Sequence, residues 1–175
     1  MNVEGQTYAY FVRSPHAHAT INSIDTSAAE ASDGVVAVLT GQQLADDGIG
    51  GLICGWVIHS KDGEPHKAPA HPALAVDKVR YVGDHVALVV AETASQARDA
   101  GEKVNVDYGV LPAAAVTATA AEASSPQVHD DAPGNICYDW ELGDLKAVDD
   151  ALGKADHITE INIRNNRLIP NAIET

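Results

Sequence analysis

Two histidines near the N-terminus have the spacing of metal ligands. His16 and His18 lie two positions apart in the stretch FVRSPHAHATI. If that stretch is a strand, both imidazoles point to the same face and both can reach one ion. A histidine site also needs a third ligand, and the other histidines are scattered without a recognised ligand spacing. Two hydrogen-bonded histidines at a strand end are therefore the simpler interpretation, and a small metalloenzyme built on His16, His18 and His85 is the alternative.

The other reactive side chains indicate no particular chemistry. Cys54 and Cys137 have no nearby base in the sequence, and we expect two buried, inert thiols. Arg164 and Arg167 flank two asparagines and could bind an anion, but surface-exposed basic residues at a strand end are the favoured interpretation. Three pairs of adjacent aspartates fall in predicted loops or on helix flanks, where a solvated acidic surface explains them: Asp46-Asp47, Asp130-Asp131 and Asp149-Asp150.

The composition narrows the class of protein further. The chain has 175 residues, of which 45% are hydrophobic, which is enough for one ordinary core or for a domain with an extension. Its formal net charge of −14 argues against binding to nucleic acid or to an anionic membrane surface. It has no apolar run of the roughly 20 residues that span a bilayer, and no signal-type opening segment. We expect no membrane insertion and a cytoplasmic location.

Alternation and capping residues predict short elements before residue 73. The stretch 7–14 is strand-like, with Tyr8, Tyr10 and Val12 on one face. Residues 19–27 fit a strand imperfectly, and 35–40 form a continuous apolar run, typical of a strand buried on both faces. Two helical turns are expected, at 27–32 and 41–48, and residues 49–72 form an irregular excursion with one short strand at 53–58.

Residues 73–113 have the clearest pattern, which runs strand, turn, strand, helix, strand. The apolar run 85–91 is a strong strand, and Thr93 with Gln96 three positions later has the spacing of a capping box. The helix that follows presents small residues that favour close packing on a sheet: Ala94, Ala97, Ala100 and Gly101. The final strand covers 103–108, and a right-handed crossover is expected if the last two strands are parallel neighbours.

The last part of the chain is less regular. Residues 113–127 are rich in small side chains and read as a linker or one loose helix. The stretches 135–144 and 157–166 alternate as strands do, and Asp144 is placed to cap a helix between them. That helix carries Leu145, Val148 and Leu152 on one stripe.

Seven stretches in order along the chain resemble one family. They are FVRSPHAHATINSIDTSAA, GVVAVLTGQQL, VRYVGDHVALVVAET, VNVDYGVLPA, HDDAPGN, WELGD and RNNRLIPNAIET. Each is weak alone, but their common order resembles the large, molybdopterin-binding subunit of the molybdenum hydroxylases, which include xanthine dehydrogenase, aldehyde oxidase and aerobic carbon monoxide dehydrogenase. After Glu174 the chain has Thr175, where the family more commonly continues as EPR.

The resemblance implies an α+β fold: an α/β-hammerhead, with a mixed sheet and packed helices, followed by the first elements of the molybdopterin-binding domain. The implied boundaries are 1–115 for the hammerhead domain, 116–134 for a linker and 135–175 for the truncated start of the next domain. In this family the segment matching SPHAHA serves the fold and binds no metal. The resemblance therefore implies no catalytic, cofactor-binding or metal-binding residue in this chain, and none for Glu174.

The family reaction is a hydroxylation in which water supplies the oxygen and molybdenum accepts two electrons. The electrons pass through [2Fe-2S] clusters to FAD on partner subunits or domains. By resemblance this chain is an inactive N-terminal scaffold of an oxidoreductase, and its partners are the remainder of the large subunit and the iron-sulfur and FAD subunits. We also expect the piece to self-associate through strands near 157–169. The alternative is a free-standing hammerhead adaptor or cofactor-delivery module.

Overall fold

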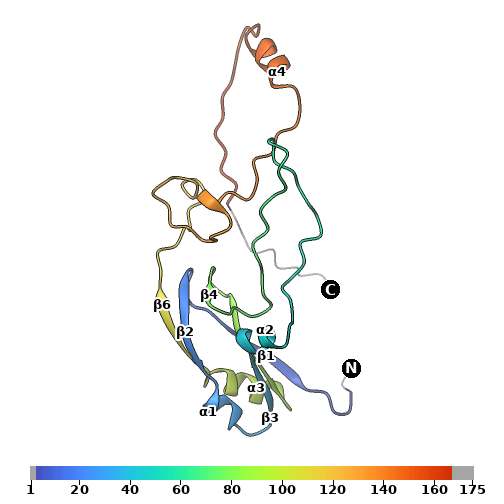
Figure 1. The fold of residues 1–175 in the computed structure, drawn as a ribbon, viewed down its shortest axis with the longest axis vertical. Helices are drawn as coiled ribbons and strands as arrows, with labels where there is room; N and C mark the ends of the chain where they lie inside the picture. Colours follow the sequence, from blue (N-terminus) through green and yellow to red (C-terminus); the bar gives the residue numbers. More distant parts are fainter. Residues whose placement is uncertain (1–2, 167–175) are drawn as a thin grey trace. The chain divides into compact units, whose positions relative to one another are not determined.

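The structure is a computed structural model that describes residues 3–166. Its chain divides into two compact units, Met1–Cys54 with Pro69–Ala113 and Gly55–Ala68 with Ala114–Thr175 (Figure 1). The strands and all but one of the α-helices belong to the first unit. In the described part of the chain, no helix is long and apolar enough to cross a membrane.

One sheet of the first unit has the strand order β1-β5-β3. β1 (Tyr8–Arg13) and β3 (Val35–Thr40) both pair antiparallel with the central strand β5 (His85–Ala91). As expected, β1 alternates, with its tyrosines and Val12 turned inward and Phe11 outward. Helices α1 (Ser27–Glu30) and α3 (Ala94–Gly101) pack against this sheet.

The second sheet has the order β4-β2-β6. β2 (Ala19–Asp25) pairs antiparallel with β4 (Lys78–Val79) and with β6 (Asn105–Val110). The register of β2 against β6 shifts between Ile21 and Ser23. This bulge puts Ile21 and Ile24 in the same core although they are three residues apart, which explains why the sequence fitted a strand pattern only imperfectly.

Two small apolar cores hold these sheets. One contains Ala19, Ala75, Val79 and Val86, and the other contains Ala29, Val38, Val89 and Ala100. Strand β5 contributes to both, because Val86 faces the first core and Val89 the second. The cores are built mainly from alanine and valine, so the backbones must approach closely. A Cβ on Gly101 would lie 2.4 Å from the ring of Tyr10, which explains glycine there.

The helix signals before residue 102 are confirmed. α2 (Gly41–Asp46) begins with a full capping box between Thr40 and Gln43. The hydroxyl of Thr93 accepts the N–H of Gln96 at the start of α3. Gly34 and Gly48 both have positive φ, as expected where a helical turn must end. The expected buried face of α3 holds for Ala97, Ala100 and Gly101, whereas Ala94 is exposed.

Two expectations for the first unit are wrong. β3 is not buried on both faces: it pairs with β5 alone, its register is irregular after Val35, and Val36 is 60% exposed. β5 and β6 also do not form a parallel crossover, because they lie in different sheets and β6 is antiparallel to β2. Periodicity identified the strands but contained no information on their partners.

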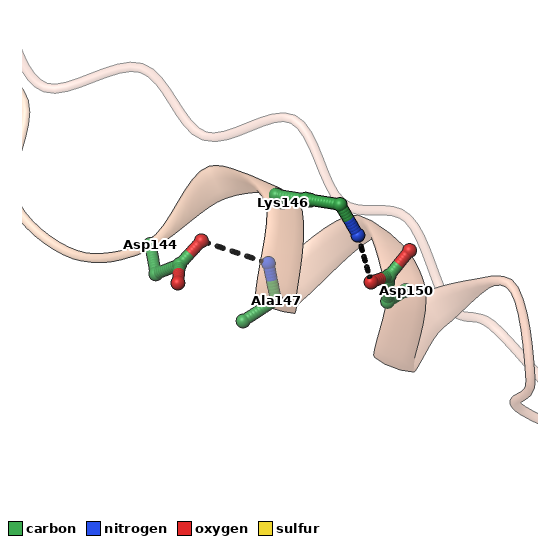
Figure 2. A network of polar contacts seen from close by, with 4 residues as sticks. All are labelled: Asp144, Lys146, Ala147 and Asp150. Carbon is green, nitrogen blue, oxygen red and sulfur yellow. Dashed lines mark hydrogen bonds and ion pairs between the residues drawn. The ribbon is translucent and has the colours of Figure 1, made fainter.

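The second unit is mostly irregular. Its helices are η1, a 3₁₀ turn at Pro133–Asn135, and α4 (Leu145–Leu152). Asp144 caps α4 as predicted: its carboxylate accepts the N–H of Ala147 at 2.9 Å (Figure 2). Figure 2 also shows the ion pair between Lys146 and Asp150 one turn apart. The stripe predicted on this helix, Leu145, Val148 and Leu152, is exposed.

The strands expected at 53–58, 135–144 and 157–166 do not form, and 113–127 is a series of turns without a helix. Only an isolated bridge between His59 and Pro65 has strand-like pairing near the first of these stretches. Ile158, Ile161 and Ile163 are all more than half exposed. Alternating side chains stabilise a strand only when a neighbouring strand and an apolar layer cover it, and this chain supplies neither there. Self-association was expected through strands near 157–169, and the part of this stretch beyond residue 166 lies outside the described residues.

Candidate functional site

His16 and His18 lie in the bend between β1 and β2, outside any strand, so the same-face geometry of a strand does not apply to them. His18 is 5% exposed, and its Nδ1 bonds the carbonyl oxygen of Pro112 at 2.8 Å. Since a carbonyl only accepts, Nδ1 carries the proton in this contact. The ring of His16 packs edge-on against Tyr108 at 4.9 Å. Both histidines therefore fasten this bend to β6 and to the segment that leaves it.

A second polar cluster surrounds the turn between β4 and β5. The carboxylate of Asp84 accepts the N–H of Arg80 at 3.0 Å, and Gly83 has a φ of +92°. The guanidinium of Arg13 donates to the carbonyl of Gly83 at 3.4 Å. Burial, followed by the negative charge of Asp84, raises the pKa of Tyr81. These contacts fasten the turn to the end of β1.

His85, the third histidine of the metal hypothesis, is part of the same cluster. Its ring stacks on Phe11 at 4.5 Å, across the β1–β5 pair. Burial, and then the positive charge of Arg13, lower the pKa of His85. Within residues 3–166, no three histidine, cysteine or carboxylate side chains are close enough to hold a metal ion, so the structure does not bring His16, His18 and His85 together as a site.

The thiol expectation is wrong. Cys54 and Cys137 are both exposed, because each lies in an irregular segment outside the two apolar cores. Arg164 is exposed too, and its proposed companion Arg167 lies outside the described residues. The paired aspartates are all exposed, at the end of α2, in a turn and on α4.

The sequence reasoning missed one feature of the second unit, an apolar groove of about 470 Å³. Its lining includes both tryptophans of the chain, Trp56 and Trp140, which are 79% and 58% exposed. Next to it lies a charged hollow of about 420 Å³, where Lys61 pairs with Asp139 at 2.7 Å. The carboxylate of Asp139 raises the pKa of Lys61. The sequence signal for this groove was the alternation of apolar and polar residues at 135–144. In the structure this alternation places side chains on the groove and does not form a strand.

The described residues do not fit a molybdenum-pterin group. Such a group carries a phosphate and needs several unpaired donors around it. The charged hollow has Lys61 and Lys67, but Asp62, Glu64 and Asp139 also line it, and the ammonium of Lys61 is already paired. The lining of the apolar groove contains no lysine or arginine that could pair with a phosphate.

Comparison with known proteins identifies the family. Residues 1–112 match the family described as aldehyde oxidase and xanthine dehydrogenase, a/b hammerhead domain. The whole chain aligns with 22% of the carbon monoxide dehydrogenase large chain of Afipia carboxidovorans, at 33% identity over 192 residues. It also aligns over its whole length with 20% of the nicotine 6-hydroxylase large subunit of Paenarthrobacter nicotinovorans, at 34% identity.

Solved structures agree. A Cu,Mo-CO dehydrogenase in its carbon monoxide reduced state superposes with a TM-score of 0.72 at 34% identity, over 90% of this chain and 20% of that one. Quinoline 2-oxidoreductase from Pseudomonas putida 86 gives 0.62 at 34% identity, over 74% of this chain and 16% of that one. This chain thus spans about a fifth of the length of these relatives. It belongs to the aldehyde oxidase and xanthine dehydrogenase family, has the α/β-hammerhead fold, and matches the N-terminal portion of molybdenum hydroxylase large subunits.

Proposed function

We propose that this chain is the N-terminal scaffold of a molybdenum hydroxylase large subunit and does no chemistry by itself. The observation that carries the proposal is coverage: the whole chain aligns, yet with only about a fifth of each large-subunit relative. The polar side chains that could have done chemistry support it. His18, His85 and Asp84 are engaged in joining the strands of the hammerhead.

The proposal assigns the molybdenum-molybdopterin cofactor to the remainder of the large subunit, and [2Fe-2S] clusters and FAD to partner subunits or domains. Residues 135–175 would open the molybdopterin-binding domain, after a linker at 116–134. The division of the described chain near residue 114 supports a boundary in this region. A cytoplasmic location stays a prediction of the sequence.

Metal content and turnover test the proposal. The native protein that carries this chain should contain stoichiometric molybdenum by inductively coupled plasma mass spectrometry. It should oxidise a member of a panel chosen from its relatives' names, namely carbon monoxide, nicotine and hypoxanthine. The isolated 175-residue chain should hold no molybdenum and turn over none of them. Turnover by the isolated chain, or a native protein without molybdenum, would overturn the proposal.

A further inference from the structure

Both tryptophans of this chain are exposed on one groove of the second unit. Large aromatic side chains are rarely left in water. A cluster of them on the surface therefore indicates an interaction site. Trp and Tyr are also the side chains that most often dominate binding energies at protein interfaces. The lining consists of Trp56, Val57, Ile58, His59, Tyr138 and Trp140.

Backbone pairing within the second unit builds this groove. Residues 58–66 form a hairpin, in which the N–H of His66 donates to Ile58 and the N–H of Ser60 donates to Glu64. The segment around Tyr138 runs beside the hairpin, because the N–H of Lys67 donates to Cys137 at 2.8 Å and that of Lys61 donates to Asp139 at 2.7 Å. Two distant parts of the sequence are thereby joined into one surface.

The alternation at 136–140 separates two kinds of side chain on this surface. Trp140 lines only the apolar groove, Cys137 and Asp139 line only the charged hollow, and Tyr138 lies between the two and lines both. The groove is thus bordered by an ion pair between Lys61 and Asp139, which is the arrangement of an apolar interface centre with a polar rim. The ring of Tyr138 is also held by an edge-on contact with His66.

Charge decides between two occupants of the groove. A second copy of this chain would bring a further net charge of −14 against the same charge, and this repulsion disfavours self-association. Polypeptide beyond the part that aligns makes up about four-fifths of each large-subunit relative, and it is not bound to repeat the charge of this chain as a second copy is.

We propose that this groove, lined by Trp56, Tyr138 and Trp140, is the docking surface for an apolar segment of the rest of the same large subunit. This inference rests on the proposed function, and it adds which residues hold the scaffold to the catalytic part. The occupying segment presents apolar side chains to the groove.

Hydrogen exchange read by mass spectrometry compares the native protein with the isolated 175-residue chain. Peptides covering 55–60 and 136–142 should exchange at least about tenfold more slowly in the native protein. A peptide around Val116, which is 58% exposed and does not line the groove, is the internal control. Equal exchange of the groove peptides in the two samples would overturn the docking proposal. Molybdenum and turnover in the same native sample would leave the proposed function standing.

Tryptophan fluorescence tests the second-copy alternative in the isolated chain. Since its two tryptophans both line the groove, acrylamide quenching reports on the groove alone. Docking to other polypeptide predicts equal quenching in dilute and concentrated samples. Quenching that falls as the chain is concentrated, together with a dimer in sedimentation, would show that a second copy fills the groove and would overturn the proposal.

Variants of the native protein provide the last test. Replacing both tryptophans, as Trp56→Ser with Trp140→Ser, should raise the exchange of the groove peptides about tenfold, back to the rate of the isolated chain. The matched control Val116→Ser should leave it unchanged. If the double variant fails to accumulate, the single variant Trp140→Phe keeps the test usable and should leave most of the protection in place. Full protection in the double variant would contradict the proposal.

Discussion

The two units of this chain use apolar side chains in opposite ways. In the described residues, every buried apolar side chain except Ala132 belongs to the first unit. The second unit also contains many apolar residues, but it leaves them in water: Trp140, Leu145 and Ile161 are all more than half exposed. The first unit completes its core from its own sequence. The second has the composition of a core and lacks the layer that would cover it.

The two units differ in whether they bury their own apolar side chains. Two sheets and three helices give the first unit neighbours for each strand, so its apolar side chains pack against each other. The capping signal of α4 is satisfied just as well as those of α2 and α3, yet its apolar stripe contacts nothing that buries it. Local signals are therefore alike in the two units, and only the packing separates them.

The largest expected effect comes from a matched pair of leucines. Leu74 is 2% exposed in the first unit, whereas Leu145 is 63% exposed on α4. Leu74→Ala should lower the free energy of unfolding by about 3 kcal/mol, through lost burial and a cavity. Leu145→Ala should change it by less than about 0.5 kcal/mol. Urea unfolding of the 175-residue chain, followed by circular dichroism, measures both, and equal losses would break the comparison between the units.

A smaller effect is expected at the buried histidine. His18→Ala removes the donor to the carbonyl of Pro112 and leaves that bend without its side chain. The free energy of unfolding should fall by about 2 kcal/mol, since a buried acceptor loses its partner and a space opens. The control His157→Ala removes an exposed imidazole of the second unit and should be neutral in the same urea experiment. A neutral His18→Ala would show that this contact does not hold the hammerhead together.

Removing a helix cap should have different effects in the two units, with a change in the free energy of unfolding of about 1 kcal/mol in the first. Thr93→Ala should lower the free energy of unfolding of the first unit by about this amount, because α3 packs on the β1-β5-β3 sheet. Asp144→Ala should instead speed hydrogen exchange within α4 and leave the urea midpoint of the first unit unchanged. A shift of that midpoint by Asp144→Ala would mean that α4 supports the hammerhead, contrary to the comparison.

The smallest effect is a pH dependence confined to the first unit. Burial lowers the pKa of His85 below its ordinary value of 6.5, so the unfolded chain binds a proton more readily than the folded one. Stability should therefore fall as pH drops through about 6.5, and this part of the fall should disappear in His85→Gln. Urea midpoints at several pH values between 8 and 5 measure it. The same slope in the variant would assign the effect to other groups.

Individual residues show how far sequence reasoning reached. Alternation in β1, the apolar run of β5 and the caps at Thr93 and Asp144 were sufficient, because each depends on near neighbours in the chain. The same reasoning failed for β3, for Cys54 and Cys137, and for the stretch 157–166. In each failure, burial depended on whether a distant segment covered the residue. The groove at Trp140 was missed for that reason as well.

Apart from the strand expected at 53–58, the amino-acid sequence by itself determined the family, the order of the elements before residue 113 and the starts of α3 and α4. Those features are encoded in spacing, turn residues and caps. Only the tertiary structure decided which strands are neighbours, that β5 and β6 belong to different sheets, and that both tryptophans meet on one exposed surface. Strand pairing and burial are properties of segments far apart in the chain. Alternation with a period of two determines which face of a strand a side chain occupies. The segment that covers this face lies elsewhere in the chain.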